Sequence, residues 1–150
     1  MTLGIRCFPD KIAFVVLEGT KQNPKVLESD VRKFPKDLSR AGFLNWASKE
    51  VRGILQRRKV KRSGFKEIEN TAKLNRALVK RAEVEGVLQA VLYEAGQVEV
   101  DGMNKMQIKK SLQFEGNAKE IGLALESTPL QEFLGRDHED AALVAWSLLN

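Results

Sequence analysis

Cysteine and histidine are almost absent from this 150-residue chain. The only cysteine, Cys7, lies in an apolar segment, so neither an intrachain disulfide nor a cysteine-based metal site can form. The only histidine, His138, lies among acidic residues, and no Gly-x-Ser-x-Gly motif is present. Hydrolysis by a serine or cysteine nucleophile, which needs a base within hydrogen-bond reach, is therefore not expected.

Glycine-rich phosphate loops and long apolar runs are also lacking. The sequence has no Gly-x-Gly-x-x-Gly and no P-loop motif, which argues against nucleotide hydrolysis by a P-loop. The apolar run at residues 12–17 is too short for a signal-peptide core or a membrane span. Together with the single cysteine, this predicts a cytoplasmic protein with no membrane partner.

The length and composition predict one domain, residues 1–150. With 43% hydrophobic and 30% charged residues, the chain is long enough for a single buried core and too short for two domains of ordinary size. It contains no internal repeat, low-complexity tract or long linker.

Positive charge is concentrated in the first half of the chain. Residues 1–75 hold 17 Lys and Arg against 8 acidic residues, whereas residues 76–150 hold 8 against 12. The densest cluster contains no acidic residue and consists of Arg57, Arg58, Lys59, Lys61, Arg62 and Lys66, and basic charge resumes at Lys73, Arg76, Lys80 and Arg81. The cluster indicates either a phosphate-binding surface or the solvated end of a helix, where cations are favoured.

Hydrophobic periodicity predicts strands followed by alternating helices and strands. Residues 3–8, 12–18 and 25–34 are expected to form an antiparallel meander. A helix with apolar residues from 44 to 55, starting behind Asp37 or Ser39, then leads to a strand at 62–69, a long helix at 74–95 and a strand at 98–101. Short helices are expected at 104–112, 117–126 and 129–134, and a last one from His138. This order predicts an α/β domain with a mixed sheet.

The last predicted helix begins with a group of ionisable residues that includes Asp137 and Asp140. Helical spacing places these two carboxylates on one face of the first turn, where they can bind a divalent cation together. Alternatively, Asp137 caps the helix, because acidic side chains are favoured at helix N-termini. The metal interpretation needs partners, since two-metal hydrolysis of phosphodiesters uses about four carboxylates around two cations.

Short motifs extend over nearly the whole chain: Leu3-Gly4-Ile5-Arg6, Phe65-Lys66-Glu67-Ile68-Glu69, Glu85-Gly86-Val87, Met106-Gln107-Ile108-Lys109-Lys110 and Asp137-x-x-Asp140-Ala141-Ala142-Leu143. In this order they resemble the RuvC-type Holliday-junction resolvases of the RNase H-like superfamily. The resemblance implies an RNase H-like fold, with a mixed five-stranded sheet made of the antiparallel meander and two parallel strands, flanked by helices. For an active member it implies a Mg²⁺-dependent endonuclease that acts on DNA rather than RNA, and a homodimer like those of the resolvases.

The family's metal ligands are only partly matched. In those resolvases the first strand supplies an aspartate, the fourth strand a glutamate, and the C-terminal helix two aspartates; Asp137 and Asp140 match the last two. Arg6 stands at the first aspartate position and Lys66 at the glutamate position. Cations at these two degenerate positions repel Mg²⁺ and are expected to pair with Asp137 or Asp140. The chain resembles degenerate, uncharacterised bacterial members of the superfamily in this respect.

Glu67 offers another way to complete an acidic site. A one-residue shift places it at the glutamate position, although strand alternation then turns its side chain to the opposite face unless a bulge intervenes. Glu69 is a further candidate.

Three functions follow from these patterns. The first is a non-catalytic or weakly active domain that binds nucleic acid through the basic cluster and needs no cofactor. The second is a Mg²⁺-dependent nuclease with a site rearranged around Asp137, Asp140 and Glu67 or Glu69. The third is a structural interaction module, for example a homodimer formed through the helix at residues 76–93.

Overall fold

The sheet is mixed and five-stranded, in the order β3-β2-β1-β4-β5. The computed structural model describes residues 1–96, 100–117 and 120–150. The antiparallel strands are β1 (Thr2–Cys7), β2 (Lys11–Gly19) and β3 (Pro24–Lys33), and β4 (Arg62–Lys66) and β5 (Val100–Met103) continue the sheet in parallel with β1. The predicted meander with two added parallel strands is therefore confirmed.

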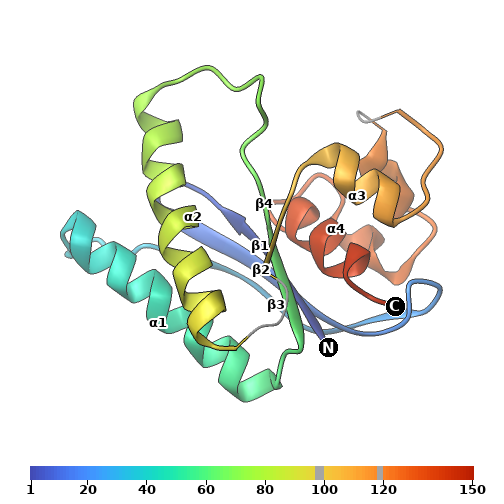
Figure 1. Ribbon diagram of the computed structural model, residues 1–150, viewed down its shortest axis with the longest axis horizontal. Coiled ribbons are helices and arrows are strands. Elements are labelled where there is room, and N and C mark those ends of the chain that lie inside the picture. The colour runs from blue at the N-terminus through green and yellow to red at the C-terminus, as the bar shows by residue number, and fades with distance from the viewer. Residues whose placement is uncertain (97–99, 118–119) are drawn as a thin grey trace.

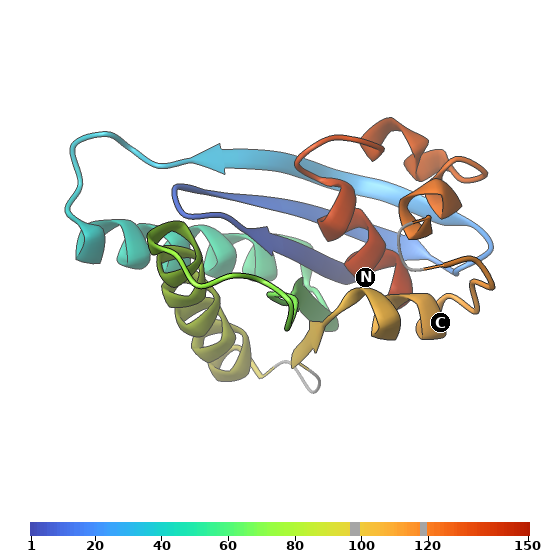
Figure 2. The same ribbon diagram turned by 90° about the horizontal axis from the view of Figure 1, so that it is seen from above.

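Helices cover both faces of the sheet, as Figures 1 and 2 show. On one face lie α1 (Arg40–Arg58) and α2 (Arg76–Glu94). On the other lie α3 (Lys105–Ser111), the 3₁₀ helices η1 (Ile121–Leu125) and η2 (Pro129–Phe133), and α4 (Glu139–Ser147). The apolar side chains accordingly form two clusters, one on each face of the sheet.

Strand β1 separates the two clusters by simple alternation. Its odd-numbered apolar residues face α1 and α2, whereas Thr2, Gly4 and Arg6 face α4. The Thr2 hydroxyl donates to the Ala145 carbonyl over 2.7 Å, and a side chain at Gly4 would overlap the Ala141 carbonyl. Helix α4 therefore packs directly on β1, and its N-terminal turn lies beside Arg6.

Side-chain hydrogen bonds cap the first three α-helices, and the first cap is Ser39, one of the two starts expected for that helix. Ser39 accepts a hydrogen bond from the Gly42 amide at 3.1 Å, and Asn75 accepts one from the Leu78 amide at 2.8 Å. Asn104 forms a full capping box at the start of α3. Leu74, predicted on the apolar stripe of the long helix, precedes the cap and is 83% exposed.

Several predicted boundaries are wrong. The fourth strand ends at Lys66 rather than residue 69, because β5 pairs with β4 only as far as Met103 opposite Lys66. The predicted fifth strand falls partly on residues 97–99, which lie outside the described residues, and β5 continues to Met103. The short helices predicted at 117–126 and 129–134 are present as the 3₁₀ helices η1 and η2, although η1 begins four residues later than predicted. No helix in the described part of the chain has the length and hydropathy needed to cross a membrane.

Candidate functional site

The carboxyl end of β1 and the first turn of α4 enclose a cavity of about 320 Å³. Its lining is Arg6, Phe8, Lys105, Gly135, Arg136, Asp137, Glu139 and Asp140. Asp137 and Asp140 thus face one cavity, as their spacing predicts. In α/β sheets this strand edge is where ligands usually bind, which makes the cavity the candidate site.

Arg6 forms an ion pair with Asp140 inside this site. The distance from Arg6 Nη1 to Asp140 Oδ2 is 3.4 Å, and about a quarter or less of each side chain is exposed. Burial lowers the pKa of the Arg6 guanidinium, and the Asp140 carboxylate partly offsets that effect. The predicted pairing of a cation at strand one with the acidic pair is confirmed for these two residues.

Asp137 binds a different cation and does not cap the helix. Its Oδ2 lies 2.5 Å from Lys11 Nζ, at the start of β2. Helix α4 begins at Glu139 after His138, and no side chain caps it. The helix-cap interpretation of Asp137 is therefore wrong, because a tertiary ion pair draws the carboxylate away from the helix amides.

Lys66 does not pair with the acidic residues of α4. Its side chain is only 2% exposed, and Nζ donates to the Glu67 carbonyl at 2.8 Å and to Glu69 Oε1 at 2.5 Å. Although partial burial acts to raise the pKa of Glu69, hydrogen bonds from Lys66 and from the Lys105 amide hold it below its usual range. The predicted contact of Lys66 with Asp137 or Asp140 is wrong, and so is its place on an exposed nucleic-acid surface.

Glu67 lies on the face of the sheet opposite α4. Phe65 packs in the apolar cluster under α1 and α2 and pairs with Gly102 of β5. Glu67 lies two residues after Phe65, so its side chain points to the same face of the sheet. The Glu67 side chain fills the space that a Cβ at Gly102 would need. The nuclease site built from Asp137, Asp140 and Glu67 is therefore not assembled, and strand alternation is the physical reason.

A further ion pair lies on the α2 side of the same sheet edge. Arg81 Nε donates to Glu85 Oε1 at 2.7 Å, and Arg81 Nη2 donates to the Lys66 carbonyl at 2.8 Å. Burial raises the pKa of Glu85, although Arg81 opposes the rise. The spacing of four residues along a helix was the available sequence signal for this pair. Lys105 and Arg136, which line the cavity, had no such signal.

The donor set of the site does not suit a divalent cation. Across residues 1–96, 100–117 and 120–150, no group of three or more His, Cys, Asp or Glu side chains is placed to hold a metal ion. Asp140, Asp137 and Glu69 are each paired with a cationic side chain instead. Two-metal hydrolysis requires carboxylates free to bind the cations, so the residues present do not fit Mg²⁺.

The basic cluster predicted from the sequence is divided in the structure. Thr2 pairs with Arg62 in the parallel ladder, which places residues 57–62 at the amino edge of β1 and β4, away from the candidate site. Arg57 and Arg58 each donate to a Glu28 oxygen at 2.7 Å. Burial acts to raise the pKa of Glu28, but these two hydrogen bonds hold it below its usual range.

The remaining members of the cluster differ in exposure. Arg62 is partly buried, and its Nη1 donates to the Leu148 carbonyl at 2.7 Å. Lys59 ends α1 in a left-handed conformation, and both Lys59 and Lys61 are exposed. Lys59 and Lys61 are therefore the members of the cluster best placed to meet a phosphate at this edge.

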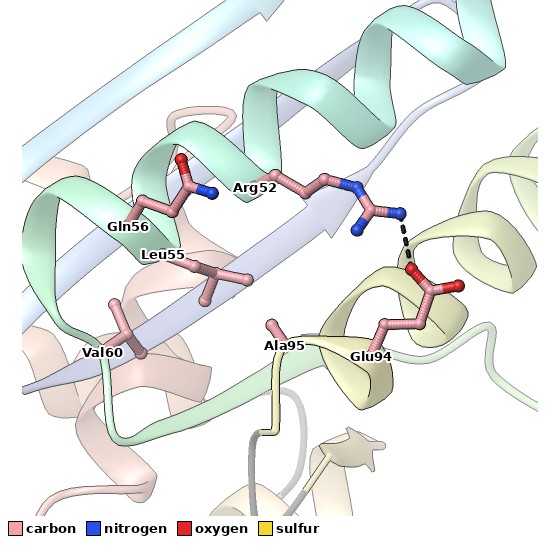
Figure 3. Close-up of a pocket in the computed structure, with 6 residues that line it drawn as sticks. All are labelled: Arg52, Leu55, Gln56, Val60, Glu94 and Ala95. Atoms are coloured by element: carbon pink, nitrogen blue, oxygen red, sulfur yellow. Dashed lines mark hydrogen bonds and ion pairs between the residues drawn. The ribbon is translucent and has the colours of Figure 1, made fainter.

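A cavity of about 430 Å³ between α1 and α2 also lies near the amino edge, as Figure 3 shows. It is lined by Arg52, Leu55, Gln56, Val60, Glu94 and Ala95. Arg52 Nη2 and Glu94 Oε2 are 2.6 Å apart and connect the two helices. Because this lining offers one internally neutralised ion pair and no nucleophile, we assign the site to the carboxyl edge.

Sequence comparisons with protein families and with curated proteins find no match. Solved structures do match. RuvC from Thermus thermophilus, in complex with a Holliday junction substrate, has a TM-score of 0.77 at 19% identity, over 97% of this chain and 90% of that one. The yeast mitochondrial Holliday junction resolvase Ydc2 has a TM-score of 0.63 at 12% identity, over 97% of this chain and 76% of that one.

A fowlpox virus resolvase, in a structure with Holliday junction DNA, has a TM-score of 0.57 at 12% identity, over 99% of this chain and 98% of that one. These matches extend over almost the whole chain and agree with the strand order and the two helical layers described above. The chain therefore has the RuvC-like RNase H fold.

Proposed function

We propose that this protein binds the phosphate backbone of DNA at the carboxyl edge of its sheet and does not cut it by two-metal hydrolysis. The observation that carries the proposal is the ion pair between Arg6 and Asp140, in which a guanidinium, rather than a metal ion, contacts the carboxylate. The solved structures of RuvC and of the fowlpox resolvase with Holliday junction DNA support DNA as the ligand.

The charges around the site suit a polyanion. Lys73, Lys105 and Arg136 are exposed at this edge, and no acidic side chain of the described residues forms an ion pair with them. Arg6 lies at the centre of the site, where it pairs with Asp140. Lys and Arg side chains of this kind release counterions from DNA when they bind its phosphates.

Replacing Lys73, Lys105 and Arg136 together by glutamine is expected to weaken DNA binding at least about tenfold, because each cation lost removes a phosphate contact. The slope of log affinity against log salt should become shallower by about one for each contact. Fluorescence anisotropy with labelled four-way and duplex DNA, across a sodium chloride series, measures both quantities.

The matched control is Lys59→Gln with Lys61→Gln, which removes exposed charge at the amino edge of the sheet. A larger loss in this control would place the interface on the sequence-predicted cluster instead. No affinity at low salt would contradict DNA binding altogether. Incubation with Mg²⁺ or Mn²⁺ should leave the four-way DNA intact, and specific cleavage would contradict the non-catalytic part of the proposal.

A second candidate function, self-association through α2, is favoured by one exposed face of that helix. Ala82, Gly86 and Ala90 follow one another at intervals of four residues, and all are exposed. A side chain at Gly86 would meet nothing within 4 Å. Tyr93, one turn further on, is 80% exposed. Small side chains let a second helix approach closely, so a homodimer pairing α2 with α2 fits this face.

Gly86→Lys is expected to convert such a dimer to a monomer, because a long charged side chain would be forced into the helix contact. Light scattering coupled to gel filtration measures the mass of each variant. Gln56→Lys, which adds the same charge at an exposed position of α1, should leave the dimer intact. A wild-type protein that is monomeric at about 100 μM would contradict this candidate, since stable interfaces have dissociation constants well below that concentration.

A further inference from the structure

A second cavity, of about 330 Å³, lies beside the candidate site between the end of β1 and the start of α2. Its lining is Arg6, Phe8, Pro9, Ala72, Lys73, Asn75, Ala77, Leu78 and Arg81. It shares Arg6 and Phe8 with the first cavity. We propose that it holds one unpaired nucleotide of a DNA strand, an inference that rests on the proposed DNA binding and narrows its ligand.

The cationic side of the cavity suits the nucleotide's phosphate. Arg6, Lys73 and Arg81 contribute to the lining, and no carboxylate does. Arg81 uses Nε for Glu85 and Nη2 for the Lys66 carbonyl, but a guanidinium has five N–H groups, so donors remain for a ligand. The first turn of α2 also carries no acidic residue that would repel an anion.

The other side of the cavity suits a base. Phe8, Pro9, Ala72, Ala77 and Leu78 give it an apolar wall. Paired bases in a duplex are stacked on their neighbours, so only an unpaired base can leave the helix and pack on such a wall. The volume is at the lower end of the range for small-molecule sites, which fits a single nucleotide.

A duplex with one unpaired adenine is therefore expected to bind about tenfold more tightly than the same duplex fully paired, a typical effect of one base contact. The two labelled DNAs are compared by fluorescence anisotropy at one salt concentration. Ala77→Trp fills the cavity from an exposed position of the first turn of α2 and removes no charge. This variant should bind both DNAs with the affinity that wild type has for the paired duplex.

Gln56→Trp adds the same bulk at an exposed position of α1 and should keep the preference for the unpaired adenine. Ala72→Trp, from the loop before α2, provides a second way to fill the cavity if Ala77→Trp does not fold. Equal wild-type affinity for the two DNAs, or a preference that survives both cavity-filling variants, would overturn this inference and leave the proposed function standing. Failure to bind either DNA at low salt would overturn both.

Discussion

Gly4→Ala is expected to lower the free energy of unfolding by about 3 kcal/mol, the upper part of the usual range for overpacking a core. Gly4 lies in the middle of β1, where α4 crosses the strand. A Cβ there would overlap the Ala141 carbonyl oxygen and crowd the Ala145 amide. Both obstacles are backbone atoms, so the helix itself must shift, and the shift would also displace Asp140 from Arg6.

Urea denaturation followed by circular dichroism measures the free energy of unfolding of Gly4→Ala and of the wild type. Gly86→Ala is the matched control, because that glycine is exposed within α2 and a new Cβ meets nothing within 4 Å. Alanine is the better helix former, so this control should gain about 0.5 to 1 kcal/mol. Unchanged stability in Gly4→Ala would show that α4 does not pack on β1 as closely as described.

Arg81→Met should cost about 3 to 5 kcal/mol of stability, because it leaves the Glu85 carboxylate buried without its partner. Arg81 and Glu85 side chains are 12% and 8% exposed, and the pair joins α2 to the end of β4 through the Lys66 carbonyl. The double variant Arg81→Met with Glu85→Gln should recover most of the loss, since no charge then remains buried. Equal losses in the single and double variants would show that packing, rather than charge, is responsible.

The loss of stability in Arg81→Met should also depend on pH. Burial already raises the pKa of Glu85 in the folded protein, and removing Arg81 raises it further. Between the ordinary carboxyl pKa and this raised value, the folded state binds a proton that the unfolded chain has released. The free energy of unfolding therefore falls as pH rises through that window. Thermal melts across mildly acidic to neutral pH should show the deficit growing with pH in Arg81→Met and not in the double variant.

Three carboxylates at or beside the candidate site each pair with a cation from a different part of the chain, whereas Glu139, which also lines the cavity, accepts a hydrogen bond from the Gly135 amide. Asp140 pairs with Arg6 of β1, Asp137 with Lys11 of β2, and Glu69 with Lys66 of β4. A metal ion would have to displace these side chains, and opposite charges already in contact resist that exchange. The same cations favour an incoming phosphate, which is why we favour binding over cleavage at this edge.

Much of the architecture was predictable because local patterns and the global fold agree. Alternating apolar residues predicted the three antiparallel strands, and Ser39, one of the two starts expected for the first helix, caps α1. The short helix predicted at 117–126 was too long, because a capping pattern such as Asn117 with Glu120 marks where a turn begins and not how long a helix continues.

For the site, the sequence by itself determined that Asp137 and Asp140 lie three residues apart at the start of the last helix and that Arg6, a cation, lies at the end of the first strand. Only the tertiary structure decided their partners. Arg6 meets Asp140 because α4 packs on β1 over Gly4, and Lys66 meets Glu69 because β4 ends there and the chain turns back. The tertiary structure also placed Arg57 and Arg58 at the opposite edge of the sheet. Helical spacing and strand alternation are local properties, whereas the contacts between charges depend on how distant segments pack.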